Sequence, residues 1–229
     1  MEKEKIKRML KEILKVTLLG FCVYGTLDYA LPEQVVQSIN RTSGGKFVYL
    51  TVLSLYLTII TTVIGYLTRT KVGKSLETTY KDLLALSFSL EGIVTLLFWI
   101  LYFINPTLLK SRKLYSEGIQ ESLLTELSQH LFPLLLLLIC QIDVRLKKRK
   151  RCISFVFGFG ILYFLETWYF YTVDGKWPYP IFKKMNTIGR ILFIFMACLI
   201  GTGCYLGLLG VNDLVHGKYE PVKEDNRSF

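Results

Sequence analysis

Five side chains in the long apolar runs of this sequence could take part in chemistry. Four are ionisable, namely Glu91, Glu126, His130 and Glu166, and the fifth is the hydroxyl of Thr51. A hydroxyl, an imidazole that removes its proton and a carboxylate that orients the imidazole together make an activated nucleophile. These residue types would allow Thr51 to act as a nucleophile and His130 as its base, but they do not by themselves favour that role over a structural one. Glu126, which shares a helix face with His130 at a spacing of four, and Glu166 are alternative orienting carboxylates.

Each of these residues also has a structural interpretation. A threonine in a helix commonly bonds a carbonyl of its own helix, and a buried histidine can bond a neighbouring helix. The other histidine, His216, lies in a polar terminal segment and is expected to be solvated. One histidine in the apolar runs does not make a metal-ligand set, and the sequence has no glycine-rich phosphate loop and no Gly-x-Ser-x-Gly segment. We therefore expect neither a metal nor another cofactor.

The elements that must position these residues are membrane spans. Of the 229 residues, 52% are hydrophobic, and polar residues are confined to short connectors instead of covering a surface. A helical span needs about 20 apolar residues. Six such runs can be read, at 13–29, 47–68, 83–104, 122–143, 152–172 and 188–210. The sequence predicts one all-α domain over residues 1–229, a polytopic transmembrane helical bundle of six spans.

The charge distribution indicates the orientation of these spans. The N-terminal tail, the connectors 69–81 and 145–151 and the C-terminal tail hold 18 Lys and Arg residues, against 8 in the alternate connectors 41–46, 110–113 and 176–184. Cytosolic connectors carry this excess, so both termini are predicted to be cytosolic. The net charge of +10 follows this membrane pattern, and we expect contact with membrane lipid and not with nucleic acid.

This topology brings three of the candidate residues to a similar depth. At a rise of about 1.5 Å per residue, Thr51 lies about 6 Å, Glu166 about 9 Å and His130 about 12 Å inside the exoplasmic boundary. The first run follows a basic segment and has no evident cleavage site, which is typical of an uncleaved signal anchor. We expect insertion into the endoplasmic reticulum, with another endomembrane or the plasma membrane as alternative destinations.

Small and hydroxyl residues recur at helical spacing on two of the runs. Such residues favour close helix packing or line a cavity. On the last run they predict a packing face through Gly203 and Gly207. On the second run the stripe consists of Thr51, Ser54, Thr58, Thr61 and Gly65, and packing is its favoured interpretation.

Three short segments resemble one known family. Gly44-Gly45 followed by Tyr49-Leu50-Thr51, then Phe98 to Tyr102 (Phe-Trp-x-x-Tyr), then Gly175 to Pro180 (Gly-x-Trp-x-Tyr-Pro) are similar in type and order to the segments of the androgen-induced-gene family. The last segment is the most specific. The resemblance covers nearly the whole chain and agrees with six spans.

The resemblance implies a function. Characterised members of that family are multipass membrane hydrolases that cleave fatty acid esters of hydroxy fatty acids with a threonine and a histidine, which correspond here to Thr51 and His130. The family substrate would be a lipid ester that enters from the membrane. Amides near Gly44 and Gly45 are one hypothesis for the oxyanion donors. The alternative is a non-catalytic scaffold or lipid-binding protein of the same fold, and a transporter is the third possibility.

Overall fold

The computed structural model describes residues 2–217, which contain helices and no strand. The helices that build the bundle are α1 (Glu2–Thr26), α3 (Leu50–Leu67), α4 (Glu77–Ile104), α6 (Leu123–His130), α7 (Phe132–Cys140), α8 (Lys150–Asp174) and α10 (Thr187–His216). Between them lie the short helices α2 (Glu33–Asn40), α5 (Arg112–Ser116) and α9 (Pro180–Lys183), and 3-10 turns at Asp28–Ala30, Gly45–Val48, Val72–Leu76, Pro106–Leu108 and Gln141–Asp143. The C-terminal cations used for the charge asymmetry, Lys218, Lys223 and Arg227, lie outside the described residues.

Within residues 2–217, five helical segments are long and apolar enough to cross a membrane: Leu50–Leu67, Gly73–Ile104, Leu123–Asp143, Lys150–Asp174 and Thr187–His216. They coincide with five of the six predicted spans. The outward faces of α8 and α10 expose large apolar side chains such as Leu162 and Phe195. Apolar surface on that scale is suited to lipid and not to water. The protein is therefore an integral membrane protein with several spanning helices.

The first and fourth predicted spans differ from the prediction of uniform apolar helices. Most of the run 13–29 lies in α1, which ends at Thr26, carries Lys11, Glu12 and Lys15, and is not among the five segments. The run 122–143 consists of two helices, because Leu131 leaves helical geometry (φ −139°, ψ −50°) between α6 and α7. Pro133 explains the break, since it has no N–H to donate and its ring clashes with the preceding turn.

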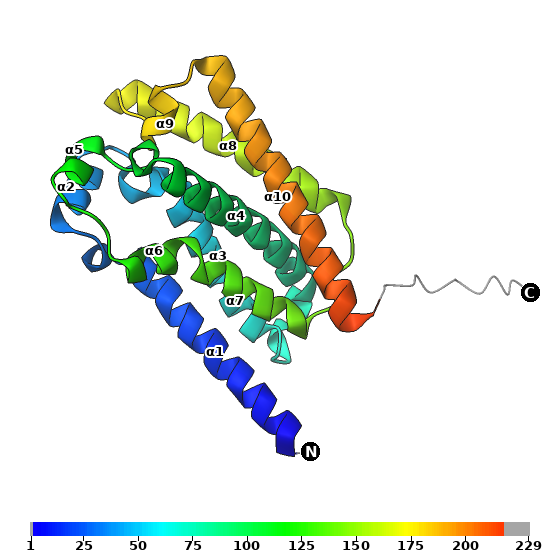
Figure 1. The fold of residues 1–229 in the computed structure, drawn as a ribbon. Helices are drawn as coiled ribbons and strands as arrows, with labels where there is room; N and C mark the ends of the chain where they lie inside the picture. Colours follow the sequence, from blue (N-terminus) through cyan, green and yellow to red (C-terminus); the bar gives the residue numbers. More distant parts are fainter. Residues whose placement is uncertain (1, 218–229) are drawn as a thin grey trace, which may run out of the picture.

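Helix α4 forms the centre of the bundle and contacts α3, α6, α7, α8 and α10 (Figure 1). Its Glu91 is fully buried and accepts a hydrogen bond of 3.0 Å from Thr58 of α3. One turn away, the hydroxyls of Thr61 and Ser87 are 2.8 Å apart. The hydroxyl stripe of α3 therefore joins α3 to α4 in this region, as the packing interpretation predicts.

The glycine face predicted for α10 is wrong. Gly203 and Gly207 are exposed, and a Cβ added at either would meet no atom within 4 Å. The close approach is made by other glycines. A Cβ on Gly92 would lie 2.9 Å from Cβ of Cys204, and one on Gly201 would lie 2.7 Å from the Ile93 side chain. Gly203 and Gly207 lie on the side of α10 that faces away from α4.

These contacts predict a matched pair of stability effects. Gly92→Ala is expected to destabilise the protein by about 1–3 kcal/mol, because the methyl group forces α4 and α10 apart. Gly203→Ala adds the same methyl group in open space inside α10, so it should not destabilise the protein and should gain up to about 1 kcal/mol from the higher helix propensity of alanine. Thermal unfolding in detergent, followed by the fraction that stays monodisperse, measures both. Equal stability of the two variants would contradict this packing.

Helix α1 runs along α6 and α7 and is held at its middle and near its C-terminal end (Figure 1). At the middle, the ammonium of Lys15, only 2% exposed, forms an ion pair with Asp143, the last residue of the Leu123–Asp143 segment. Near the C-terminal end, the side-chain amide of Gln129 in α6 donates to the carbonyl of Gly25 at 2.8 Å. Helix α1 therefore covers most of the length of the α6–α7 segment.

Candidate active site

A cavity of about 700 Å³ opens among the helix ends at one end of the bundle. The short helices α2, α5 and α9 gather at this end, opposite the N-terminus of α1 (Figure 1). The wall includes the first turn of α3, the second half of α4, the end of α6 and the connection between α8 and α10. Its wall combines apolar and aromatic side chains with many polar and charged groups, a lining that suits an amphiphilic ligand. Thr51, Glu126 and His130 all line it.

Thr51 lies in the first turn of α3, directly after Leu50, whose backbone amide is hydrogen-bonded to Tyr163. The hydroxyl of Tyr163 accepts from the Leu50 N–H at 3.2 Å and donates to the Val48 carbonyl at 3.1 Å. The helix begins there because Tyr49 has extended geometry (φ −94°, ψ 123°). The amides of a first helical turn have no partner within the helix, so they are available to a ligand or a side chain. Tyr163 thus fixes the position of Thr51.

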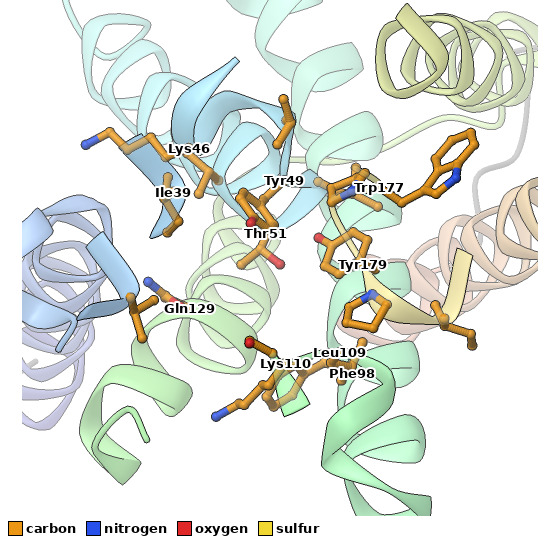
Figure 2. Close-up of a pocket in the computed structure, with 18 of the residues that line it drawn as sticks. Ile39, Lys46, Tyr49, Thr51, Phe98, Leu109, Lys110, Gln129, Trp177 and Tyr179 are labelled. Carbon is orange, nitrogen blue, oxygen red and sulfur yellow. The ribbon is translucent and has the colours of Figure 1, made fainter. Parts of the chain in front are cut away.

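Tyr179, in the connection between α8 and α10, meets Thr51. In Figure 2 the hydroxyls of Thr51 and Tyr179 point toward each other across a short space. Burial raises the pKa of the Tyr179 phenol, and its interactions with the hydroxyl and the backbone N–H of Thr51 act in the opposite direction. The Tyr179 hydroxyl therefore stays protonated at neutral pH and can donate a hydrogen bond beside the Thr51 hydroxyl.

His130, the last residue of α6, is 7% exposed and is held by contacts of its ring. Its Nδ1 lies 3.0 Å from the backbone carbonyl and 3.2 Å from the carboxylate of Glu126. The ring stacks on Phe98 at a centroid distance of 3.4 Å and an angle of 7°. Since both oxygens are acceptors, they favour the tautomer with the proton on Nδ1 and leave the lone pair on Nε2. An imidazole held in this way can act as a base through Nε2.

Glu126 is itself paired with a cation. The ammonium of Lys110, in the connection between α4 and α5, forms ion pairs with Glu126 and Glu121. Burial alone would lower the pKa of Lys110, but its hydrogen bonds to these two carboxylates outweigh burial and raise the pKa. The ammonium of Lys110 thus supplies a positive charge beside the carboxylate that contacts His130. Sequence reasoning did not identify Lys110, which is one of several lysines in a polar connector.

The whole chain has known relatives. The profile of the family described as FAR-17a/AIG1-like protein matches residues 12–213. The chain belongs to this family. The human androgen-dependent TFPI-regulating protein is 28% identical over 215 residues, which cover 89% of this chain and 92% of the human protein. A membrane protein of Schizosaccharomyces pombe is 26% identical over 175 residues, which cover 75% and 77% of the two chains. No solved structure shows a significant match.

The resemblance to the androgen-induced-gene family, which the sequence motifs indicated, is thereby confirmed. In this member of the FAR-17a/AIG1-like family, the Gly-Lys-Trp-Pro-Tyr-Pro motif closes one side of the cavity. Gly175 ends α8 in left-handed geometry (φ 67°), which glycine adopts without strain. Trp177 stacks on Tyr171 at a centroid distance of 4.4 Å, and Tyr179 reaches Thr51. The motif was the available signal for Tyr179, although the sequence did not assign it a role.

Gly44 and Gly45, the glycine pair of the same family resemblance, have structural roles. A Cβ on Gly44 would lie 2.2 Å from the Val48 side chain and 2.9 Å from Phe170, so only glycine fits. The Gly45 N–H bonds the Thr42 carbonyl at 3.0 Å. The Gly45 amide hypothesised as an oxyanion donor is therefore engaged in a turn.

The structure separates the candidate residues into two groups. Thr51, His130 and Glu126 line one cavity. Glu166, partly buried on α8, and Glu91, in the core, are not part of the wall. No hydrogen bond joins Thr51 to His130 across the described cavity. Such bonds are often long before a substrate is bound, so the two residues face a shared space in which a substrate could lie between them.

Proposed function

We propose that this protein is a membrane-embedded lipid ester hydrolase with Thr51 as nucleophile and His130 as base. The observation that carries the proposal is the single cavity whose wall contains both residues, with the Nδ1 of His130 held by Glu126. Membership of the FAR-17a/AIG1-like family supports the same assignment. The proposed substrates are fatty acid esters of hydroxy fatty acids or similar acyl esters, and no metal or cofactor takes part.

The reaction has two halves. Nε2 of His130 takes the proton of the Thr51 hydroxyl while Oγ1 forms a bond to the ester carbonyl carbon. The carbon–oxygen bond to the hydroxy acid then breaks, and His130 returns the proton to that leaving oxygen. In the second half, His130 deprotonates a water molecule that attacks the acyl-threonine. The fatty acid leaves, and the proton goes back to Thr51.

Two donors near Thr51 suit the developing oxyanion. They are the Tyr179 hydroxyl and the Thr51 N–H in the first turn of α3, which already interact with each other. An N–H at a helix N-terminus also carries part of the helix dipole, which favours a negative charge. Glu126 is the positioning carboxylate in this mechanism, and Glu166 has no part in it.

The apolar walls agree with a lipid substrate. Ile93, Val94 and Leu97 of α4, with Ile194 and Ala197 of α10, line the cavity below its polar rim. Long acyl chains gain free energy from such walls, by about 25 cal/mol for each Å² removed from water. We propose that the substrate enters laterally from the membrane, and that the protein acts in the endoplasmic reticulum.

A non-catalytic lipid-binding protein of the same fold is the second candidate. The observation in its favour is that the Thr51 hydroxyl meets Tyr179 and makes no bond to His130. Labelling by a fluorophosphonate probe separates the two candidates. Membranes that carry the enzyme should become covalently labelled, and a substrate ester should protect them. A folded protein that neither labels nor hydrolyses esters would support the binding protein.

We further propose that α1 also spans the membrane, as the first of six spans, and that both termini are cytosolic. Helix α1 lies beside the α6–α7 segment from Asp143 to Gln129, so a membrane that encloses one segment encloses the other. Its charged residues occupy its N-terminal half up to Lys15, which lies near the start of the predicted span 13–29, and there Lys15 meets Asp143 and Arg69 meets Glu12. Charge at a span end can reach the interface, which makes these residues compatible with a span.

This topology predicts the location of two reporters. A tag at the C-terminus should be digested by protease added to sealed microsomes, because that end is cytosolic. A tag inserted at the exposed Lys176, between α8 and α10, should be protected until detergent opens the vesicles. Protection of the C-terminal tag in intact vesicles would contradict six spans.

A further inference from the structure

The cations on the cavity wall differ in what neutralises them. Lys46 pairs with Asp28 at 2.9 Å, and Lys110 pairs with Glu121 and Glu126. Arg190, in the first turn of α10, also lines the cavity and is partly buried. Within residues 2–217 no carboxylate lies within ion-pair distance of its guanidinium. A partly desolvated cation without a counter-charge favours the binding of an anion.

The Arg190 guanidinium is held in a defined plane. Its Nε donates to the Phe182 carbonyl at 2.9 Å. Its central carbon lies 4.3 Å from the centroid of Trp177, which in turn stacks on Tyr171. The Phe182 carbonyl thus accepts the Nε–H of Arg190, and the face of the Trp177 ring holds the guanidinium by a cation–π contact. Among the described residues, the two terminal nitrogens of Arg190 have no hydrogen-bond partner.

A planar fork of two N–H groups matches a carboxylate or a phosphate oxygen pair. Beyond Arg190 on the same helix, Phe193, Ile194 and Ala197 continue the cavity wall as apolar surface. A cation at the rim and an apolar wall behind it suit an amphiphile with an anionic end and a long hydrocarbon chain. The Gly-Lys-Trp-Pro-Tyr-Pro loop links this cation to the reaction centre, since Trp177 contacts Arg190 and Tyr179 contacts Thr51.

We propose that Arg190 binds the free carboxylate of the lipid ester and so determines which esters are cleaved. This inference rests on the proposed hydrolase function and adds a specificity-determining residue to it. An ester that keeps a free acid group is held at Arg190 while its ester carbonyl lies at Thr51. An ester without that group lacks this anchor.

Binding is tested without reference to catalysis. Dibromostearic acid and its methyl ester are titrated into the detergent-solubilised full chain, and quenching of tryptophan fluorescence is followed, with Trp177 as the reporter beside Arg190. The parent should bind the acid at least about tenfold more tightly than the methyl ester. Arg190→Gln should remove that difference. Arg190→Lys should keep part of it, because the charge remains while the fork is lost.

The matched control is Lys184→Gln, which removes one positive charge from an exposed residue in the connection between α8 and α10 that is not part of the cavity wall. It should leave the preference for the acid intact. A parent that binds both ligands equally would overturn the assignment, as would an Arg190→Gln variant that keeps the preference. Displacement of the acid by lysophosphatidate but not by oleate would reassign Arg190 to a phosphate.

Hydrolysis provides the second readout. With an ester that carries a free acid, Arg190→Gln should raise KM about tenfold or more, while the same ester capped as its methyl ester should be cleaved as by the parent. If the parent binds the acid through Arg190 and cleaves neither ester, the hydrolase proposal fails and the anion site stands. If the parent cleaves both esters and Arg190→Gln changes neither rate, the anion site fails and the hydrolase proposal stands.

Discussion

Thr51→Ala is expected to lower the rate of lipid ester hydrolysis about 10³-fold or more, because it removes the atom that forms the covalent intermediate. Fluorophosphonate labelling should disappear with it. The side chain lies at a cavity wall and is only partly buried, so its loss should change folding little. Release of fatty acid by membranes with matched amounts of folded protein measures the effect.

Two further variants make this result specific. Thr51→Ser keeps a hydroxyl at the same place and should retain labelling and measurable turnover. Thr202→Ala is the matched control, since the Thr202 hydroxyl donates to the Cys198 carbonyl of its own helix at 2.9 Å and is remote from the cavity wall. It should behave like the parent. If folded Thr51→Ala protein still labels and hydrolyses at the parent rate, the threonine mechanism is wrong.

His130→Gly is expected to lower the turnover rate by about 10²–10⁴-fold, the range for loss of a general base. The missing ring leaves a space beside Phe98, which now stacks on it at 3.4 Å. Added imidazole can occupy that space, so it should restore part of the activity of His130→Gly. It should restore none to Thr51→Ala. A structural role for His130 would instead predict loss of folded protein and no response to imidazole.

The two candidate carboxylates give a graded comparison within the same experiment. Glu126→Gln should reduce turnover by less than His130→Gly, since Nδ1 keeps its contact of 3.0 Å with the Glu126 backbone carbonyl. Glu166→Gln should leave turnover unchanged, because Glu166 is not part of the cavity wall. A larger loss from Glu166→Gln than from Glu126→Gln would contradict the position assigned to Glu126.

Hydropathy was sufficient to predict the class of fold and five of the spans. Lipid offers no partner for backbone polar groups, so an apolar run of about 20 residues has few structural choices other than a helix. The break after His130 is a local effect of Pro133, yet the length of the apolar run concealed it. The motif with Trp177 and Tyr179 marked the correct segment for the cavity, although its contacts could not be derived from spacing.

Rotation about each helix axis was decided by the tertiary structure. Depth in the membrane proposed Glu166 and the spacing of four from His130 proposed Glu126, and only packing placed Glu126 on the cavity wall and left Glu166 outside it. In the same way, the spacing of Gly203 and Gly207 described a face of α10 without indicating its partner, and the contact with α4 formed through Gly92 and Gly201. A sequence gives the order of residues along a helix, whereas the direction each face points depends on how all the helices fill their shared volume.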